Sequence, residues 1–280
     1  MFTNGESLGG FVSPAVECNE VANVLPLFNG RFPAAHKPAE HEYDIHVVGT
    51  TGQRNLACEL LNRMYGWRGY GANHSLCPTG HSSTFAADAN GEIVATLTLT
   101  VDSSAGLAAE RTFGDVIEEA RASGAKLCEL TKFASLPSTD SKHLLASLFH
   151  TIFIYGTERH GCTDLFIEVN PRHVRFYEIM LGFERAGDLR TNKAVDAPSQ
   201  LMRLKVADIA RYIDLYAGCE KGGAVRSLYP FFFSREEEER VRNKVAESFV
   251  AADPSEMRDG DGQRLARIDG FAAIGQGMAA

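Results

Sequence analysis

The residue of this sequence best suited to chemistry is a glutamate inside an otherwise apolar segment. Glu129 lies in the middle of residues 126–134, which the sequence predicts to be a strand, between a cysteine and a leucine. A carboxyl group in such surroundings loses part of its hydration, which raises its pKa and suits it to accept a proton directly or through one water. Alternatively, Glu129 could simply pair with Lys132 or with a distant arginine.

Two further side chains could take part in catalysis. Tyr177 carries a phenol that can donate a proton to a leaving group, although its spacing from Val174 and Leu181 equally fits the packed face of a helix. Thr131 lies two residues beyond Glu129, so the two side chains share one face of the predicted strand. Glu129, Tyr177 and Thr131 are therefore the candidate catalytic residues.

One group of potential metal ligands does not have the spacing of a metal site. His74, Cys77 and His81 form an isolated triplet with a proline inside it, whereas zinc sites normally combine two ligand pairs. We expect no metal ion and no other bound cofactor.

Charge, cysteine content and hydropathy restrict the class of protein. The 280 residues contain 28 lysines and arginines against 36 aspartates and glutamates, and the formal net charge of −8 argues against nucleic acid as a partner. The six cysteines are far apart and form no Cys-x-x-Cys pair, which fits a reducing compartment. No stretch has the roughly 20 apolar residues of a membrane-spanning helix, and the start of the chain lacks a signal-peptide pattern. We expect a cytoplasmic protein without a transmembrane segment.

Periodic apolar residues predict the elements that must position these side chains. Strands are expected at 42–48, 83–87, 93–101, 126–134, 165–169, 183–189 and 200–206. Helices are expected at 51–64, 111–122, 140–155 and 172–181. Their order predicts one α/β domain over residues 42–206, with a mixed central sheet flanked by helices.

The segments on either side of this domain show no recognisable chemistry. Residues 1–41 lack a helical or strand period and are expected to form a loosely ordered arm. Residues 207–252 are expected to form a helical extension, with helices at 207–216 and 235–250. Residues 253–280 are rich in Gly and Asp and are expected to be disordered.

Four motifs of the domain resemble known N-acyltransferases. Residues 169–183, with a tyrosine shortly before Gly-Phe, resemble the strand-helix-strand element of GNAT enzymes. Residues 129–134 resemble the Glu-x-Ser/Thr-Arg-Phe strand of acyl-homoserine-lactone synthases and of long-chain N-acyl amino acid synthases. Residues 102–107 resemble an Asp and Gly-Leu motif of the latter family, and residues 194–198 resemble its approach to the last strand. The resemblance is therefore greatest to the long-chain N-acyl amino acid synthase family and covers about residues 43–206.

This resemblance implies a GNAT-like fold and transfer of a long-chain fatty acyl group to the α-amino group of an amino acid. An amine must be neutral to attack a thioester, so Glu129 would act as the base, and Tyr177 would protonate the departing thiolate. The apolar acyl chain would run through the splayed centre of the sheet.

The resemblance also suggests residues that bind the substrates. Related synthases hold substrate with an arginine and aromatic residues near the position of Arg63 and Trp67, although the spacing differs here and a packed lid is an equally good interpretation. Lys132 and Phe133 complete the strand motif and are further candidates for contact with the substrate.

The expected acyl donor is acyl carrier protein rather than acyl-CoA. CoA-dependent members of the fold have a glycine-containing loop that binds the pyrophosphate, and residues 135–142 occupy that place here without a glycine. The phosphopantetheine of a carrier has a single phosphate, which Ser138, Ser141 and Lys142 could hold at a helix start. An ordinary helix cap explains the same three residues.

A second candidate contact for the carrier is a basic helix start. Arg172, His173 and Arg175 could attract the acidic surface of a carrier protein, although a solvated basic face has the same composition. Two other functions remain possible from the sequence: an acyl-homoserine-lactone synthase, and a non-catalytic module that binds acyl chains or the carrier.

Overall fold

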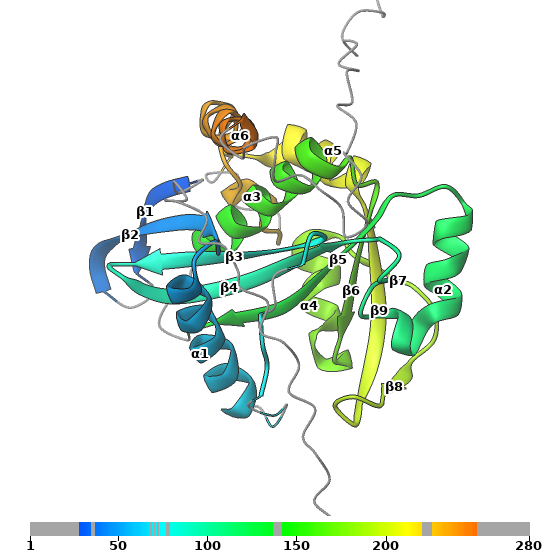
Figure 1. The fold of residues 1–280 in the computed structure, drawn as a ribbon. Coiled ribbons are helices and arrows are strands. Elements are labelled where there is room, and N and C mark those ends of the chain that lie inside the picture. Colours follow the sequence, from blue (N-terminus) through cyan, green and yellow to red (C-terminus); the bar gives the residue numbers. More distant parts are fainter. Residues whose placement is uncertain are drawn as a thin grey trace, which may run out of the picture.

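The computed structural model is built around a nine-stranded sheet with helices on both faces (Figure 1). It describes residues 28–34, 37–67, 69, 71, 73–76, 79–136, 142–219 and 226–250. The strands are β1 (Phe28–Ala34), β2 (Lys37–Val47), β3 (Ser82–Ala89), β4 (Glu92–Val101), β5 (Leu127–Ser135), β6 (Asp164–Val169), β7 (Glu184–Arg185), β8 (Arg190–Asn192) and β9 (Ala197–Lys205). The helices are α1 (Thr51–Trp67), α2 (Glu110–Ala122), α3 (Lys142–His160), α4 (Pro171–Leu181), α5 (Val206–Tyr216) and α6 (Arg235–Val250), with a short 3-10 helix, η2 (Tyr229–Phe231).

The sheet separates at its centre, between β5 and β6. The strand order is β1-β2-β3-β4-β5-β6-β9-β7, with β8 paired to β9, and β5 and β6 form its parallel pair. Their pairing covers three residue pairs and ends where Glu129 meets Phe166. Beyond this point β5 and β6 have no ladder to join them, which opens the sheet beside Glu129.

A bulge in β5 lies next to this opening. The register between β4 and β5 shifts between Thr96 and Thr98, so that Lys132 and Phe133 have no direct partner on β4. Lys132 has a φ of 55°, and its carbonyl accepts a hydrogen bond from the Thr96 hydroxyl at 3.2 Å. The bulge places two residues, Lys132 and Phe133, opposite the single residue Leu97 of β4, and both border the opening.

Helices cover both faces of the sheet. Apolar residues of α1 pack over β3, β4 and β5, and those of α2 pack over β5, β6 and β9 on the same face. The opposite face carries the largest apolar cluster, to which α3, α4 and α5 contribute. Both faces of β4 and β5 are therefore buried, which is why the polar residues Thr96 and Thr98 of β4 are buried as well.

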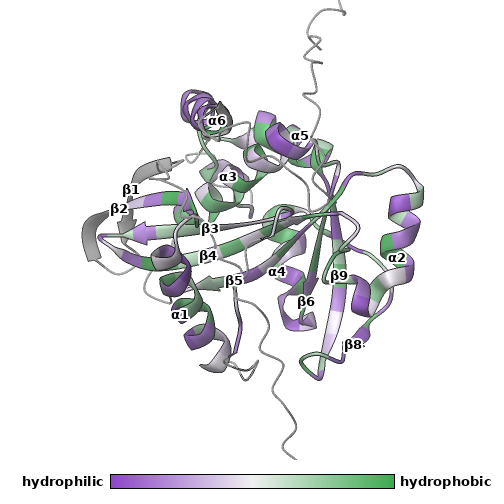
Figure 2. Cartoon of the chain, viewed as in Figure 1, coloured by the Kyte–Doolittle hydropathy of each residue, from purple (hydrophilic) through white to green (hydrophobic). Residues whose placement is uncertain are grey.

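The C-terminal extension packs directly on α3. Twelve of the 19 residues of α3 are buried, because the sheet covers one side of the helix and η2 with α6 covers the other. His150 of α3 stacks on Phe232 and Phe233, with ring centroids 4.9 and 4.8 Å apart. Figure 2 shows the resulting contrast between a largely hydrophobic α3 and a hydrophilic α6.

No helix within the described part of the chain has the length and hydropathy needed to span a membrane.

Local signals in the sequence account for several of these elements. Asn170 accepts a hydrogen bond from the backbone of Arg172 at the start of α4, Pro171 is its first residue, and Gly182 ends it with a φ of 80°. The turn between β3 and β4 has Asn90 and Gly91 at positive φ, as a two-residue hairpin requires.

Three predictions differ from the structure. Residues 28–34 and 37–41 form strands, so the expected loosely ordered arm is wrong for them, while residues 1–27 lie outside the described chain. The expected strand 183–189 is reduced to Glu184–Arg185, because Gly187 has a φ of 82° and turns the chain away. The helical spacing of Leu56 from Leu60 predicts that it shares the packed face of α1, but Leu56 is 44% exposed. The expected disordered tail, 253–280, also lies outside the described residues.

Candidate active site

A cavity of about 730 Å³ fills the opening between β5 and β6 and reaches both faces of the sheet. On the face of α2 its wall is polar and contains Glu129, Thr131, Glu168 and Ser199. On the face of α3 and α4 its wall is apolar and contains Leu130, Leu145, Phe149, Ile167 and Val169. A substrate that enters this cavity therefore meets a polar compartment and an apolar compartment within one continuous space.

Glu129 is the buried acid of the polar compartment. Its side chain is 1% exposed, and its Oε2 accepts hydrogen bonds from the backbone N–H groups of Ala108 at 2.7 Å and Ala109 at 3.4 Å. Burial raises the pKa of Glu129 to about 7, although the two amides, which stabilise the carboxylate, oppose this shift. A carboxyl group that titrates near neutral pH and borders a cavity is suited to act as a general base.

The loop that supplies these amides is held by a network of ion pairs. Arg121 of α2 binds Asp102 at 2.8 Å and Glu110 at 2.5 Å, so it joins the two ends of the loop. Gly106 has a φ of 72°, and a Cβ at this position would lie 2.8 Å from Oε2 of Glu110. The Asp and Gly-Leu motif of residues 102–107 thus fixes the backbone that holds Glu129.

Glu168 is a second acidic residue of the polar compartment, and the sequence analysis did not select it. Its Oε1 accepts hydrogen bonds from the Ser199 hydroxyl at 2.5 Å and from the Asn192 amide at 2.8 Å. Its other oxygen has no hydrogen-bond partner among the described residues. The signal was present in the sequence, because Glu168 is the acidic residue within an apolar strand, the same pattern that singled out Glu129.

Tyr177 and Thr131, the other candidate catalytic residues, both line the cavity. Tyr177 projects from α4 and packs edge-on against Phe176 and Phe183, with ring centroids 5.3 and 5.8 Å away. Burial raises the pKa of Tyr177 to about 12, so its phenol stays protonated at neutral pH and can donate a proton. Thr131 shares its face of β5 with Glu129, as expected.

Three of the four candidate substrate-binding residues line the cavity, and the fourth does not. Trp67, Lys132 and Phe133 line the cavity, and Trp67 is 77% exposed at its mouth. Lys132 donates a hydrogen bond from Nζ to the carbonyl of Ser75 at 2.9 Å. Arg63 is outside the cavity lining and lies on the surface, with its guanidinium 4.0 Å from Glu92.

The candidate carrier contacts are dispersed as well. His173 lines the cavity, whereas Arg172 and Arg175 lie on the exposed surface of the same helix outside the lining. Lys142 is the first residue of α3, with Nζ 5.5 Å from the centre of the Phe231 ring. Ser138 and Ser141 lie outside the described residues.

The segment 194–198 takes part in the site. Val195, Ala197 and Pro198 line the cavity at the start of β9, next to the polar compartment.

Among the residues that the structure describes, no three His, Cys, Asp or Glu side chains are grouped as metal ligands, and Cys77 lies outside this set.

Comparison with solved structures identifies the fold. The structure of FeeM, an N-acyl amino acid synthase from uncultured soil microbes, superposes with a TM-score of 0.54 at 22% identity, over 61% of this chain and 94% of that one. Weaker matches include the acyl-homoserine-lactone synthase LasI (TM-score 0.44, 12% identity, 59% and 90% covered) and a Pseudomonas aeruginosa acyl-CoA N-acyltransferase (TM-score 0.42, 14% identity, 58% and 98% covered). The expected GNAT-like fold is confirmed.

The sequence itself also matches a family. No curated protein matches the chain. The family described as N-acyl amino acid synthase FeeM matches residues 57–205, which is more than half of the 280 residues and includes β3 to β9, α1 from its seventh residue, and every strand that borders the cavity. The chain therefore belongs to the FeeM family of N-acyl amino acid synthases.

Proposed function

We propose that this protein transfers a long-chain fatty acyl group from acyl carrier protein to the α-amino group of an amino acid, in the cytoplasm. The observation that carries the proposal is the two-sided cavity, in which Glu129 lies on the polar side of the opening and an apolar wall lies on the other. The amine would enter the polar compartment, the acyl chain would occupy the apolar compartment, and the thioester carbonyl would lie between β5 and β6.

After the protonated amine of the acceptor has released one proton to solvent, the reaction needs two further proton transfers. The amine nitrogen of the acceptor attacks the thioester carbonyl carbon, a C–N bond forms, and Glu129 takes the proton that the nitrogen loses. The C–S bond then breaks, and the pantetheine sulfur takes a proton from the Tyr177 phenol, which recovers it from Glu129 or from solvent. The products are an N-acyl amino acid and the free thiol of the carrier.

Glu168 would bind the acceptor before it reacts. Free amino acids carry a protonated amine at neutral pH, and the unpaired oxygen of Glu168 offers an anionic hydrogen-bond acceptor for it. Ser199 and Asn192 hold the other oxygen and so fix the direction of the carboxylate. Lys132, on the cavity wall, would attract the carboxylate of the same amino acid.

The choice of donor rests on the sequence of residues 135–142. This segment contains no glycine, and a pyrophosphate cradle made of backbone amides needs close approach of the ligand to the chain. A carrier-bound phosphopantetheine lacks both the pyrophosphate and the nucleotide, so it does not require such a cradle. No cofactor is needed for the reaction beyond this acyl-phosphopantetheine substrate.

The test uses the purified full chain with acyl carrier protein or CoA bearing the same acyl group, and with a mixture of amino acids. Mass spectrometry should detect N-acyl amino acids, with a higher kcat/KM for the carrier donor. Equal or better use of acyl-CoA would refute the donor assignment. A product from S-adenosylmethionine but none from amino acids would show a lactone synthase instead, and carrier binding without any product would show a binding module.

A further inference from the structure

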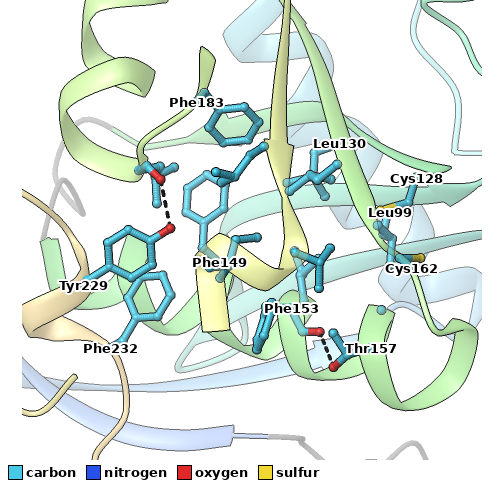
Figure 3. A pocket seen from close by; sticks show the side chains of 17 residues that line it. Leu99, Cys128, Leu130, Phe149, Phe153, Thr157, Cys162, Phe183, Tyr229 and Phe232 are labelled. Carbon is cyan, nitrogen blue, oxygen red and sulfur yellow. Dashed lines mark hydrogen bonds between the residues drawn. The ribbon is translucent and has the colours of Figure 1, made fainter. Parts of the chain in front are cut away.

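A second, smaller cavity of about 40 Å³ lies within the large apolar cluster on the face of the sheet that α3 covers. Figure 3 shows the rings of Phe149, Phe183, Tyr229 and Phe232 on one side of it and Leu99 and two cysteines on the other. Nearly all of its lining is apolar. An apolar cavity of this kind stays dry, so it is space that an apolar ligand could fill without displacing bound water.

Two residues line both this space and the main cavity. Leu130 of β5 and Phe149 of α3 line both cavities. The Phe149 ring lies 6.3 Å from the ring of Phe133, which borders the main cavity, and the Phe149 residue is 9% exposed. Leu130 and Phe149 therefore form a wall between the two cavities.

The C-terminal extension closes the far end of the small cavity. Val206, Ile209, Tyr229 and Phe232 all contribute to its lining, and all four lie beyond residue 205, where the match to the family ends. The Tyr229 hydroxyl donates a hydrogen bond to the Leu181 carbonyl at 2.8 Å, and its ring lies 4.8 Å from that of Phe232. This end of the cavity is thus held firmly to α4.

We propose that the wall of Leu130 and Phe149 sets the length of acyl chain that the enzyme accepts, and that the small cavity is the closed remainder of the acyl site. The proposal rests on the proposed function, because it assumes that the acyl chain occupies the apolar compartment. The terminal carbons of a bound chain would end against Phe149. Removal of this ring would join the two spaces, and Tyr229 and Phe232 would then form the new end.

The experiment is a competition among acyl carrier proteins loaded with saturated chains of increasing length. Phe149→Ala should shift the products towards longer chains, by on the order of two to four carbon atoms, because the volume of the ring is added to that of the small cavity. The ratio of kcat/KM for the longer chain to that for the wild-type optimum should rise at least about tenfold, since one methylene in an apolar pocket discriminates by this much. An equal loss at every chain length would overturn the proposal.

Gly156 provides a matched control inside the small cavity. It lines this cavity from α3, and a Cβ there would meet Cδ2 of Leu99 at 3.5 Å, which is ordinary van der Waals contact. Gly156→Ala alone should leave the chain-length optimum unchanged, because the wall is still closed. Combined with Phe149→Ala, it should reverse part of the shift, and a double variant identical to Phe149→Ala would contradict the proposal.

Two further measurements keep the outcomes distinguishable. If the alanine variant does not fold, Phe149→Leu takes its place in the test. This variant keeps an apolar side chain in the wall and should give a smaller shift towards longer chains. The Tm of wild type and variant in the presence of free fatty acids of increasing length reports binding without turnover, and the length giving the largest increase should be greater for Phe149→Ala. If wild type makes no N-acyl product, the proposed function fails, whereas an unchanged fatty-acid length dependence refutes the wall itself.

Discussion

The backbone N–H of Ala108 donates a hydrogen bond of 2.7 Å to Oε2 of Glu129, and this contact joins the loop after β4 to the centre of β5. It fixes one oxygen of the acid in place. The carboxyl group also borders the cavity, so it remains within reach of a substrate. Because burial outweighs the stabilisation that the amide gives to the anion, Glu129 can take up and release a proton near neutral pH.

Replacement of Glu129 by glutamine should abolish most of the activity and preserve the fold. The amide of glutamine keeps an oxygen that can accept the bond from Ala108, but it is not a base. We expect kcat to fall by about 10²–10⁴. Steady-state kinetics and circular dichroism of the same preparation would test this, and wild-type turnover in the variant would remove Glu129 from catalysis.

The activity should fall as the pH is lowered through about 7, the value to which burial raises the pKa of Glu129. Only the deprotonated carboxylate accepts the proton of the amine, so kcat/KM should drop about tenfold per pH unit below this value. A pH profile from 5.5 to 8.5 would measure it. Protonation of the substrate amine also lowers kcat/KM, so the wild-type profile should become steeper below pH 7. Any residual activity of Glu129→Gln should keep the decline due to the amine but lack this break, and a break near pH 7 in the variant would assign it to another group.

Stability should depend on pH in the opposite direction. The folded-state pKa of Glu129 is raised above the value of an unfolded chain, so its contribution to stability is present below about pH 4.3 and is lost as the pH rises through about 7. Glu129→Gln carries no such loss. Its Tm should exceed that of wild type at pH 8, and the difference should shrink towards pH 4, as thermal unfolding at several pH values would show.

Replacement of Glu168 by glutamine should weaken binding of the amino acid more than it slows the chemical step. The variant keeps an oxygen for Ser199 and Asn192 but loses the negative charge that attracts the ammonium group. We expect KM for the amino acid to rise about tenfold, and kcat to change less. Ser199→Ala is the control that keeps the charge, and an equal KM increase in both variants would favour a structural role for Glu168.

Charge reversal at Arg172 and Arg175 should weaken docking of the carrier protein. Both residues are exposed on α4, the helix that contributes His173 and Tyr177 to the cavity. Replacement of both arginines by glutamate should raise KM for acyl carrier protein about tenfold and leave KM for a short acyl-pantetheine unchanged, because the latter has no protein surface.

The effect of these substitutions should also weaken with salt, which shortens the Debye length to about 8 Å at physiological ionic strength. Arg111→Glu on α2, at the opposite face of the sheet, changes the net charge by the same amount as Arg172→Glu or Arg175→Glu alone, and it is the control for these single variants. Equal losses with both donors, or the same loss in the Arg111 variant, would exclude this surface from carrier docking.

The sequence by itself determined the elements whose signals are local. The caps of α4 at Asn170 and Gly182 lie next to the helix in the chain, and the Asn90-Gly91 turn specifies its hairpin without help from other segments. Glu129 was found in the same way, because a charged residue inside an apolar run is visible without knowledge of its neighbours. The order of the predicted strands and helices from β2 to α6 followed from such signals, but the short strand β8 and the 3-10 helix η2 were not predicted.

Only the tertiary structure decided what these elements place side by side. Ala108 lies 21 residues from Glu129, and its amide reaches the carboxyl because α2 packs over β5 and β6. The importance of Glu168 likewise depends on where β5 and β6 separate, which is a matter of register between distant strands. Phe232 closes a cavity that begins more than a hundred residues earlier. Such contacts have no local signal, because burial is shared among segments that meet only when the chain is folded.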